Sequence, residues 1–219
     1  MNAADVQCKI RELGIIPVVR TDHASAARDA IEALFAAGIT VIEITMTVPN
    51  AIELIREQVA QYERQLLIGA GTVTTAAQAN HCLDAGAEFL VSPGLFSPIL
   101  RLAQDKGKLA IPGVLSPTEI MAAHAKGVDL MKVFPCGSVG GPKYIKSLKG
   151  PFPQLNFIPT GGVSISNTAD YIAAGAYALG AGADLVDTKA LREGNTAKVS
   201  NAAREFLSVI QKARQMAAK

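Results

Sequence analysis

The sequence predicts one α/β domain in which eight parallel strands alternate with eight helices. Three observations predict it: a length of 219 residues, a repeat of glycines that end helices, and short apolar runs between helical segments. A chain of this length suits one barrel or sandwich domain. With 49% apolar residues it can bury a sizeable core, which excludes a disordered chain.

Four glycines recur at nearly constant spacing. Gly38, Gly86, Gly127 and Gly175 lie 48, 41 and 48 residues apart, each at the end of a segment with helical character. Glycine just past a helix adopts the left-handed conformation that ends it. A short apolar run, typical of a buried parallel strand, follows each one, at residues 41–44, 89–91, 130–134 and 177–179.

Four other apolar runs lie between these, at residues 15–19, 66–68, 109–111 and 157–158. Each is followed by residues that favour a helix start. Ser116-Pro117-Thr118-Glu119 is the clearest case, with a serine cap, proline in the first turn and glutamate three residues after the cap. Apolar spacing also predicts a short N-terminal helix and a final helix over residues 199–213.

Strands that alternate with helices indicate a parallel sheet covered by helices. Eight units in this length predict a (β/α)8 TIM barrel with an extra N-terminal helix, formed by residues 1–219 as one domain. A doubly wound open sheet is the alternative. No GxGxxG motif follows the first strand, which removes the usual dinucleotide-binding version of that fold.

Composition narrows the class of partner. The net charge of +2 is spread along the chain, so no nucleic-acid partner is expected. The three cysteines and three histidines lack metal-ligand spacing, and no metal or other cofactor is expected. No apolar run reaches the roughly 20 residues of a membrane span, and the N-terminus lacks a signal-peptide pattern. We therefore expect a cytoplasmic protein without a membrane partner.

Two charged residues interrupt predicted strands. Lys132 lies within the run 130–134, and Glu43 lies between two isoleucines. Burial favours the uncharged, nucleophilic form of an amine, and a buried carboxylate needs a partner. Strands two and six face each other across a barrel, so the two side chains could meet at its mouth. A structural ion pair is the alternative, as is a lysine that reaches out to solvent.

Other polar and glycine-rich segments follow predicted strands, where barrels carry their sites. Arg20 ends the first strand and suits carboxylate binding, although a surface arginine would look the same. Gly69-Ala70-Gly71-Thr72 follows the third. Glycine-rich turns at residues 161–162 and 180–182 follow strands seven and eight, the usual phosphate position. Tight turns without a ligand are the alternative there.

These residues together resemble the 2-keto-3-deoxy-6-phosphogluconate / 4-hydroxy-2-oxoglutarate aldolase family. The resemblance runs from Ile15 to about Leu191. It is carried by the following segments: Ile42-Glu43-Ile44-Thr45, Gly69-Ala70-Gly71-Thr72-Val73, Val91-Ser92-Pro93-Gly94, Ile111-Pro112-Gly113, Lys132-Val133-Phe134-Pro135 and Pro159-Thr160-Gly161-Gly162-Val163.

The resemblance implies a class I aldolase that cleaves a 2-keto-4-hydroxy acid to pyruvate and an aldehyde, either glyceraldehyde 3-phosphate or glyoxylate. It implies a homotrimer, Lys132 as the Schiff-base lysine and Glu43 as the general acid and base. The implied pyruvate pocket and phosphate site consist, respectively, of Arg20, Thr72, Pro93, Phe134 and Thr160, and of Gly161, Gly162, Gly182 and Ala183.

Two positions depart from the family pattern. Many members carry an arginine for the substrate carboxylate where this chain has Thr47, and Arg20 is the expected replacement. Ala183 stands where members carry a serine that contacts phosphate, with Ser164 or Ser138 as candidate substitutes. The substrate would be a keto acid or sugar phosphate. Two alternatives remain: an isomerase or epimerase that uses Glu43 as a base, and a non-catalytic keto-acid binding barrel.

Overall fold

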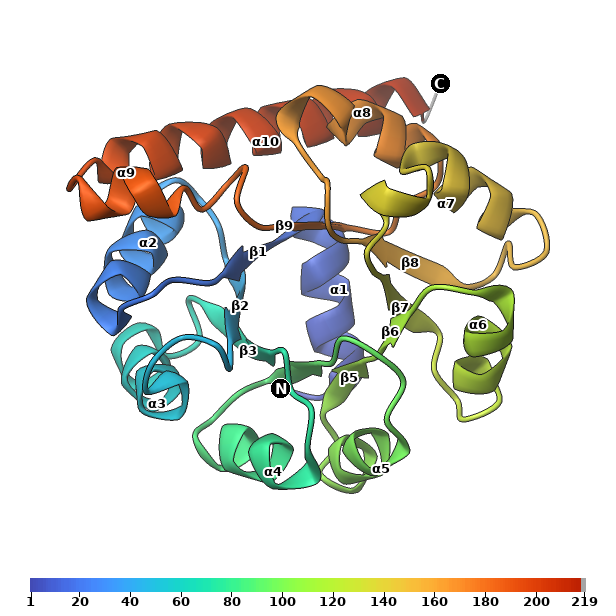
Figure 1. Ribbon diagram of the computed structural model, residues 1–219, viewed down its shortest axis with the longest axis horizontal. Coiled ribbons are helices and arrows are strands. Elements are labelled where there is room, and N and C mark those ends of the chain that lie inside the picture. Colours follow the sequence, from blue (N-terminus) through green and yellow to red (C-terminus); the bar gives the residue numbers. More distant parts are fainter. Residues whose placement is uncertain (218–219) are drawn as a thin grey trace.

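A computed structural model describes residues 1–217 of the chain. Strands and helices alternate along this part (Figure 1). The strands are β1 (Ile15–Val19), β2 (Val41–Thr45), β3 (Leu67–Gly71), β4 (Phe89–Val91), β5 (Leu109–Ile111), β6 (Gly113–Val114), β7 (Leu130–Val133), β8 (Asn156–Pro159) and β9 (Leu179–Ala181). The helices are α1 (Ala3–Leu13), α2 (Ala24–Ala36), α3 (Ala51–Tyr62), α4 (Ala76–Asp84), α5 (Ser97–Asp105), α6 (Pro117–His124), α7 (Pro142–Lys149), α8 (Ile165–Ala173), α9 (Thr188–Arg192) and α10 (Thr196–Ala217), with a 3-10 turn η1 (Gly137–Val139).

All strand pairs in the described residues are parallel, which confirms the predicted α/β class. In Figure 1 the strands lie around α1 in projection and the other helices lie outside them. The strands form a six-stranded sheet of order β5-β4-β3-β2-β1-β9 and a three-stranded sheet of order β6-β7-β8. This differs from the single continuous sheet that the sequence predicted.

The break between β5 and β6 has a local cause. Pro112 separates β5 from β6, and proline has no N–H to donate to a ladder. Its carbonyl still accepts a hydrogen bond from the Lys132 N–H at 3.0 Å. On the other side, Tyr177 N–H donates to the Phe157 carbonyl at 2.9 Å and a parallel bridge joins Thr160 to Gly180. The two sheets therefore remain in backbone contact at both junctions.

Helix boundaries follow the predicted chemistry. Each of the four repeat glycines has a positive φ, between 78° and 101°, and each follows a helix end. Ser116 and Glu119 form the expected capping box at the start of α6. Three elements were not predicted. The helical segments α9 and η1 are too short to show helical periodicity, and β6 has only two residues. The last strand begins at Leu179, two residues later than predicted.

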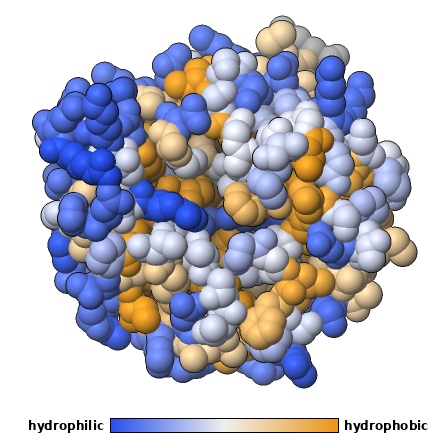
Figure 2. Space-filling view, in the orientation of Figure 1, coloured by the Kyte–Doolittle hydropathy of each residue, from blue (hydrophilic) through white to orange (hydrophobic). Residues whose placement is uncertain are grey.

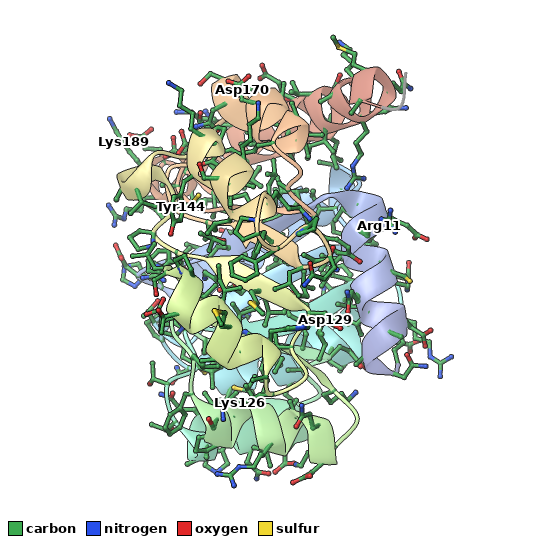
Figure 3. The ribbon with its side chains drawn as sticks, turned by 90° about the vertical axis from the view of Figure 1, so that its right-hand side faces the viewer. Arg11, Lys126, Asp129, Tyr144, Asp170 and Lys189 are labelled. Atoms are coloured by element: carbon green, nitrogen blue, oxygen red, sulfur yellow. The ribbon has the colours of Figure 1, made fainter. Side chains whose placement is uncertain are left out.

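The core has two parts. The larger cluster packs the outward-facing strand residues against the surrounding helices. The smaller one joins Val6 and Ile10 of α1 to inward-facing residues of the strands, such as Ile16, Val41 and Leu130. Helix α1 thus closes the end of the fold where the strands begin, which we call the floor. Seen from the side, α1 and Arg11 lie at one edge of the molecule and Lys189 lies at the opposite edge (Figure 3).

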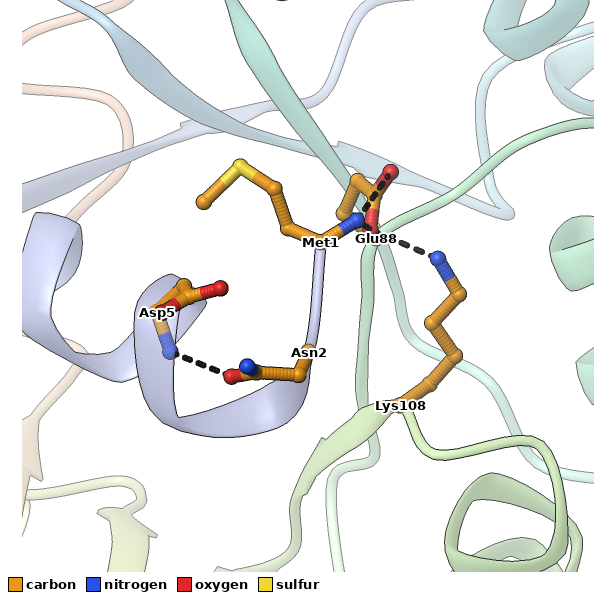
Figure 4. A network of polar contacts seen from close by, with 5 residues as sticks. All are labelled: Met1, Asn2, Asp5, Glu88 and Lys108. Atoms are coloured by element: carbon orange, nitrogen blue, oxygen red, sulfur yellow. Dashed lines mark hydrogen bonds and ion pairs between the residues drawn. The ribbon is translucent and has the colours of Figure 1, made fainter.

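Polar contacts fix α1 at the floor (Figure 4). Asn2 caps the helix by accepting a hydrogen bond from the Asp5 N–H at 2.9 Å. The Met1 ammonium lies 3.2 Å from Glu88 Oε2, which also binds Lys108 Nζ at 2.6 Å. Burial opposes ionisation of Glu88, but the hydrogen bonds and charges of these two cations together hold its pKa below the usual range. No helix within residues 1–217 is long and apolar enough to cross a membrane.

Candidate active site

Lys132 and Glu43 meet inside the fold. Lys132 comes from β7 and Glu43 from β2, and their neighbours Met131, Val133 and Ile44 pack outward into the larger core cluster. Strand alternation therefore turns both charged side chains inward. Lys132 Nζ lies 3.8 Å from Glu43 Oε1, with 7% and 3% of the two residues exposed. The structure therefore confirms the prediction that these two side chains meet.

The structure makes room for the Glu43 carboxylate but leaves one of its oxygens without a hydrogen-bond partner among the described residues. Glu43 Oε1 is buried and has no hydrogen-bond partner among the described residues. Gly71, on the neighbouring strand, leaves the space for it, because a Cβ there would overlap the Glu43 carboxylate. A buried polar atom without a partner is rare in proteins and marks a place where a water or ligand group binds.

Arg20 and Thr72 form a second polar contact at the ends of β1 and β3. Arg20 Nη2 donates to Thr72 Oγ1 at 3.2 Å. Thr72 has a φ of +56°, a left-handed conformation that is costly for a β-branched residue. Such conformations persist where surrounding structure enforces them, and they are common at ligand sites. Residues 44–55, which follow Glu43, include no lysine or arginine, so this segment offers no cation to replace Arg20.

One cavity of about 490 Å³ opens at the carboxyl ends of the strands, opposite α1, and we call this end the mouth. The same face of the molecule is hollowed near its centre, where hydrophilic and hydrophobic residues lie side by side (Figure 2). The cavity is lined by Val18, Arg20, Thr72, Pro93, Lys132, Phe134, Thr160, Gly161, Gly162, Val163, Gly182, Ala183 and Asp184.

Every predicted binding residue therefore lines this cavity, and Glu43 lies beside it through its contact with Lys132. Sequence reasoning missed Val18, Val163 and Asp184. The two valines belong to runs that read as ordinary core. Asp184 follows the glycine-rich turn after β9, and its place in a loop beyond the last strand was the one available signal.

Phe134 and Thr160 line the same cavity as Lys132, the first with an aromatic ring and the second with a hydroxyl group. The Phe134 ring, 39% exposed, has its centroid 5.3 Å from Lys132 Nζ. The peptide bond between Phe134 and Pro135 is cis. Thr160 Oγ1 lies over Gly180, where a Cβ would overlap it, so glycine at that position keeps the threonine in place.

The glycine-rich turn after β8 presents backbone donors to the cavity. Gly161 and Gly162 have φ values of 84° and 78°, which favour glycine. Among residues 1–217, no backbone carbonyl accepts a hydrogen bond from the N–H of Gly162, Val163 or Ala183. Helix α8 begins just beyond, with Ser164 in a capping box. Free N–H groups near a helix N-terminus suit an anion.

The two serines considered as substitutes for the missing hydroxyl at Ala183 do not fill that role in this structure. Ser164 Oγ contacts Ser166 Oγ at 2.9 Å and caps α8, and Ser138 belongs to the η1 turn. Neither residue lines the cavity. No alternative nucleophile is evident nearby, because burial raises the pKa of the Cys136 thiol to about 11. No cluster of His, Cys, Asp or Glu suited to a metal ion occurs in the described part.

A parallel α/β fold with a buried lysine–carboxylate pair at the carboxyl ends of its strands is typical of lyases that work through a lysine amine. Comparison with known proteins gives the family. The model of the KDPG and KHG aldolase family matches residues 6–202. The chain belongs to the KDPG and KHG aldolase family, which confirms the resemblance seen in the sequence.

Individual relatives cover nearly the whole chain. It is 36% identical over 206 residues to the 2-dehydro-3-deoxy-phosphogluconate aldolase of Pseudomonas aeruginosa, covering 94% of this chain and 93% of the relative. It is 35% identical over 191 residues to the KHG/KDPG aldolase of Escherichia coli K12, covering 87% and 89%. Among solved structures, KDPG aldolase from Legionella pneumophila, with pyruvate captured as a covalent carbinolamine, has a TM-score of 0.85 at 32% identity, covering 91% of this chain and 97% of that one.

Proposed function

We propose that this protein is a class I aldolase that cleaves 2-keto-3-deoxy-6-phosphogluconate, or a related 2-keto-4-hydroxy acid, to pyruvate and an aldehyde. The observation that carries the proposal is the buried Lys132–Glu43 pair at the mouth cavity. Family membership supports lyase chemistry. A carbinolamine of pyruvate, as captured in the Legionella relative, is the adduct that forms on the way to an imine.

In the proposed mechanism, the uncharged amine of Lys132 attacks the 2-keto carbon and forms a carbinolamine. Loss of water then gives a protonated imine. This imine accepts the electron pair released when the C3–C4 bond breaks, so an enamine forms and the aldehyde leaves. Protonation of the enamine at C3 and hydrolysis release pyruvate and restore the amine.

Glu43 is the proposed general acid and base in these steps. Its Oε1 faces Lys132 and has no other partner among the described residues, so it is free to bind the water or hydroxyl whose proton moves. It would supply the proton that expels water from the carbinolamine. It would also remove the proton from the C4 hydroxyl as the C3–C4 bond breaks.

The remaining lining residues are proposed to orient the substrate. Arg20 is exposed and hydrogen-bonded only to Thr72 Oγ1 among the described residues, so its guanidinium retains donors for the substrate carboxylate. Thr72 and Thr160 supply hydroxyl groups to the same pocket. Pro93 and Phe134 would shield the imine from water, because both present apolar surface beside Lys132.

The far end of the substrate is proposed to lie over the turns after β8 and β9. The free N–H groups near Gly161, Gly162 and Ala183 would donate hydrogen bonds to a phosphate or another polar end group. A Cβ at Gly182 would meet no protein atom within 4 Å, so the glycine leaves open space beside this turn for the substrate. This part of the site lacks the hydroxyl donor that Ser supplies in other members.

We further propose that residues 1–219 form one domain in which the two sheets act as one (β/α)8 barrel. The proline junction between β5 and β6 and the hydrogen bond from Tyr177 to Phe157 support it. Slow amide hydrogen exchange at Lys132 and Tyr177, comparable to that of central strand residues, would agree with a continuous barrel. Rapid exchange at Tyr177 would contradict it.

A homotrimer is proposed from family resemblance alone. Sedimentation or light scattering should give about three times the chain mass of 22.9 kDa. A monomer or dimer at micromolar concentration would contradict the trimer, while leaving the proposed reaction intact because each chain carries its own lysine–glutamate pair.

The deciding experiment is to trap the imine. Protein incubated with pyruvate and then reduced with borohydride should carry one stable adduct on Lys132, located by peptide mass spectrometry. Lys132→Ala should show neither adduct nor cleavage, whereas Lys146→Ala, which changes an exposed lysine of α7, should retain both. A folded wild-type protein without an adduct would contradict the aldolase mechanism and favour the isomerase or binding alternatives.

A further inference from the structure

One feature of the mouth cavity plays no part in the proposed mechanism. Among the lining residues that the structure describes, Asp184 is the one with an acidic side chain. It lies in the loop after β9, next to Ala183 and directly beyond the glycine-rich turn. The side chain is exposed, and it makes no ion pair or hydrogen bond with residues 1–217. Its charge is therefore not compensated within the described chain.

Charge is distributed unevenly around this cavity. The two lining cations, Arg20 and Lys132, belong to the end of β1 and to β7, where the keto acid is proposed to bind. The turns after β8 and β9 contribute backbone N–H groups and the Asp184 carboxylate, but no cationic side chain lines that part of the described cavity. An anionic end group would meet backbone dipoles together with a like charge.

We propose that Asp184 is a specificity-determining residue that weakens the use of substrates whose aldehyde half ends in a phosphate dianion. The inference rests on the proposed aldolase function and deepens it. A dianion near a carboxylate loses Coulomb energy that a neutral hydroxyl end does not lose. Ala183 adds to the effect, because it offers the phosphate no hydroxyl donor.

The exposure of Asp184 to solvent limits the expected size of its effect on substrate preference. Asp184 is in contact with solvent, so its repulsion is screened by water and salt, as for other surface charges. We therefore expect a change on the order of threefold to tenfold in relative specificity, rather than an absolute block. The discrimination should decrease at high ionic strength, when the Debye length falls to roughly 3–4 Å.

The test compares 2-keto-3-deoxygluconate with its 6-phosphate as substrates. For Asp184→Asn, the ratio of kcat/KM for the phosphorylated over the unphosphorylated compound should rise about threefold to tenfold over wild type. Most of this gain should disappear in roughly 0.5 M salt. Asp105→Asn, which changes an exposed aspartate of α5 away from the cavity, should leave the ratio at the wild-type value.

A second variant separates charge from hydrogen bonding. Ala183→Ser restores a hydroxyl without changing charge, so it should raise the same ratio with little dependence on salt. If the wild-type protein cleaves both substrates and Asp184→Asn leaves the ratio unchanged or lowers it, the proposed role of Asp184 is overturned. The proposed aldolase function then still stands. A wild-type protein that cleaves neither and forms no pyruvate adduct overturns both.

Discussion

The floor and the mouth of this fold are built from the same strands but carry opposite chemistry. At the floor, α1 places Val6 and Ile10 against apolar strand residues, and the ion pairs of Met1, Glu88 and Lys108 lie outside this apolar contact. At the mouth, charged side chains point inward and Glu43 Oε1 has no hydrogen-bond partner among the described residues. The difference indicates that one end stabilises the fold while the other tolerates unfavourable local energies.

Residues with positive φ also line the mouth cavity. Thr72 is in the left-handed region, and Gly161 and Gly162 have positive φ. Such positions cost stability, of order 1–3 kcal/mol for a non-glycine residue, and are maintained by the packed structure around them. In parallel α/β barrels the amino ends of strands serve stability and the carboxyl ends serve function. The comparison can be tested by variants at either end.

The largest effect on stability is expected at the floor. Ile10→Ala removes a fully buried side chain and leaves a cavity between α1 and the strands, so the free energy of unfolding should fall by about 2–5 kcal/mol. Denaturant unfolding measures this, and kcat of the surviving folded protein should remain near wild type. The exposed control Glu12→Ala should cost less than about 0.5 kcal/mol. A large loss of kcat in folded Ile10→Ala would break the separation between the two ends.

At the mouth, Glu43→Gln should lower kcat strongly while changing stability little. Removing the general acid and base should lower kcat by about a hundredfold or more, while the neutral amide keeps the shape of the side chain. Steady-state kinetics checks the rate, and thermal unfolding should show a small change only. Glu205→Gln on α10, an exposed position, is the matched control. Near-wild-type turnover in Glu43→Gln would make the pair with Lys132 structural.

A smaller and different effect is expected from Arg20. Loss of its charged hydrogen bonds to the substrate carboxylate should raise KM for the keto acid by about tenfold, corresponding to roughly 1.4 kcal/mol. Arg20→Lys should lie between wild type and Arg20→Ala, because it keeps the charge without the forked geometry. If KM is unchanged in Arg20→Ala, another group holds the carboxylate.

The smallest effect is expected in the ionic network of the floor. The pKa of Glu88 is lowered in the folded protein, so its stabilisation is present above the unfolded pKa of roughly 4.3 and is lost as pH falls through the lower folded value. Glu88→Gln should reduce stability by about 0.5–1 kcal/mol at pH 7 and by less near pH 3. Unfolding curves at the two pH values check the sign. An equal loss at both would mean that packing, not charge, explains the effect.

Sequence alone was sufficient for the regular parts of the fold. Glycines after helices, serine caps and continuous apolar runs are local signals, and they predict β1, β4 and β5 with their observed boundaries. The short α9 and η1 have no periodicity to detect. The break at Pro112 could not be predicted, because its effect depends on which strand lies beside it in three dimensions.

Prediction from the sequence is limited in the same way at the candidate active site. A lysine and a glutamate inside apolar runs, together with the family motifs around them, are enough to mark Lys132 and Glu43 as a candidate pair. Only the tertiary structure decided that their side chains lie 3.8 Å apart and that Arg20 contacts Thr72. It also brought Asp184 to the cavity beside the glycine-rich turns. Local sequence determines which way a side chain faces, whereas the convergence of strands that are distant in the chain determines what it meets.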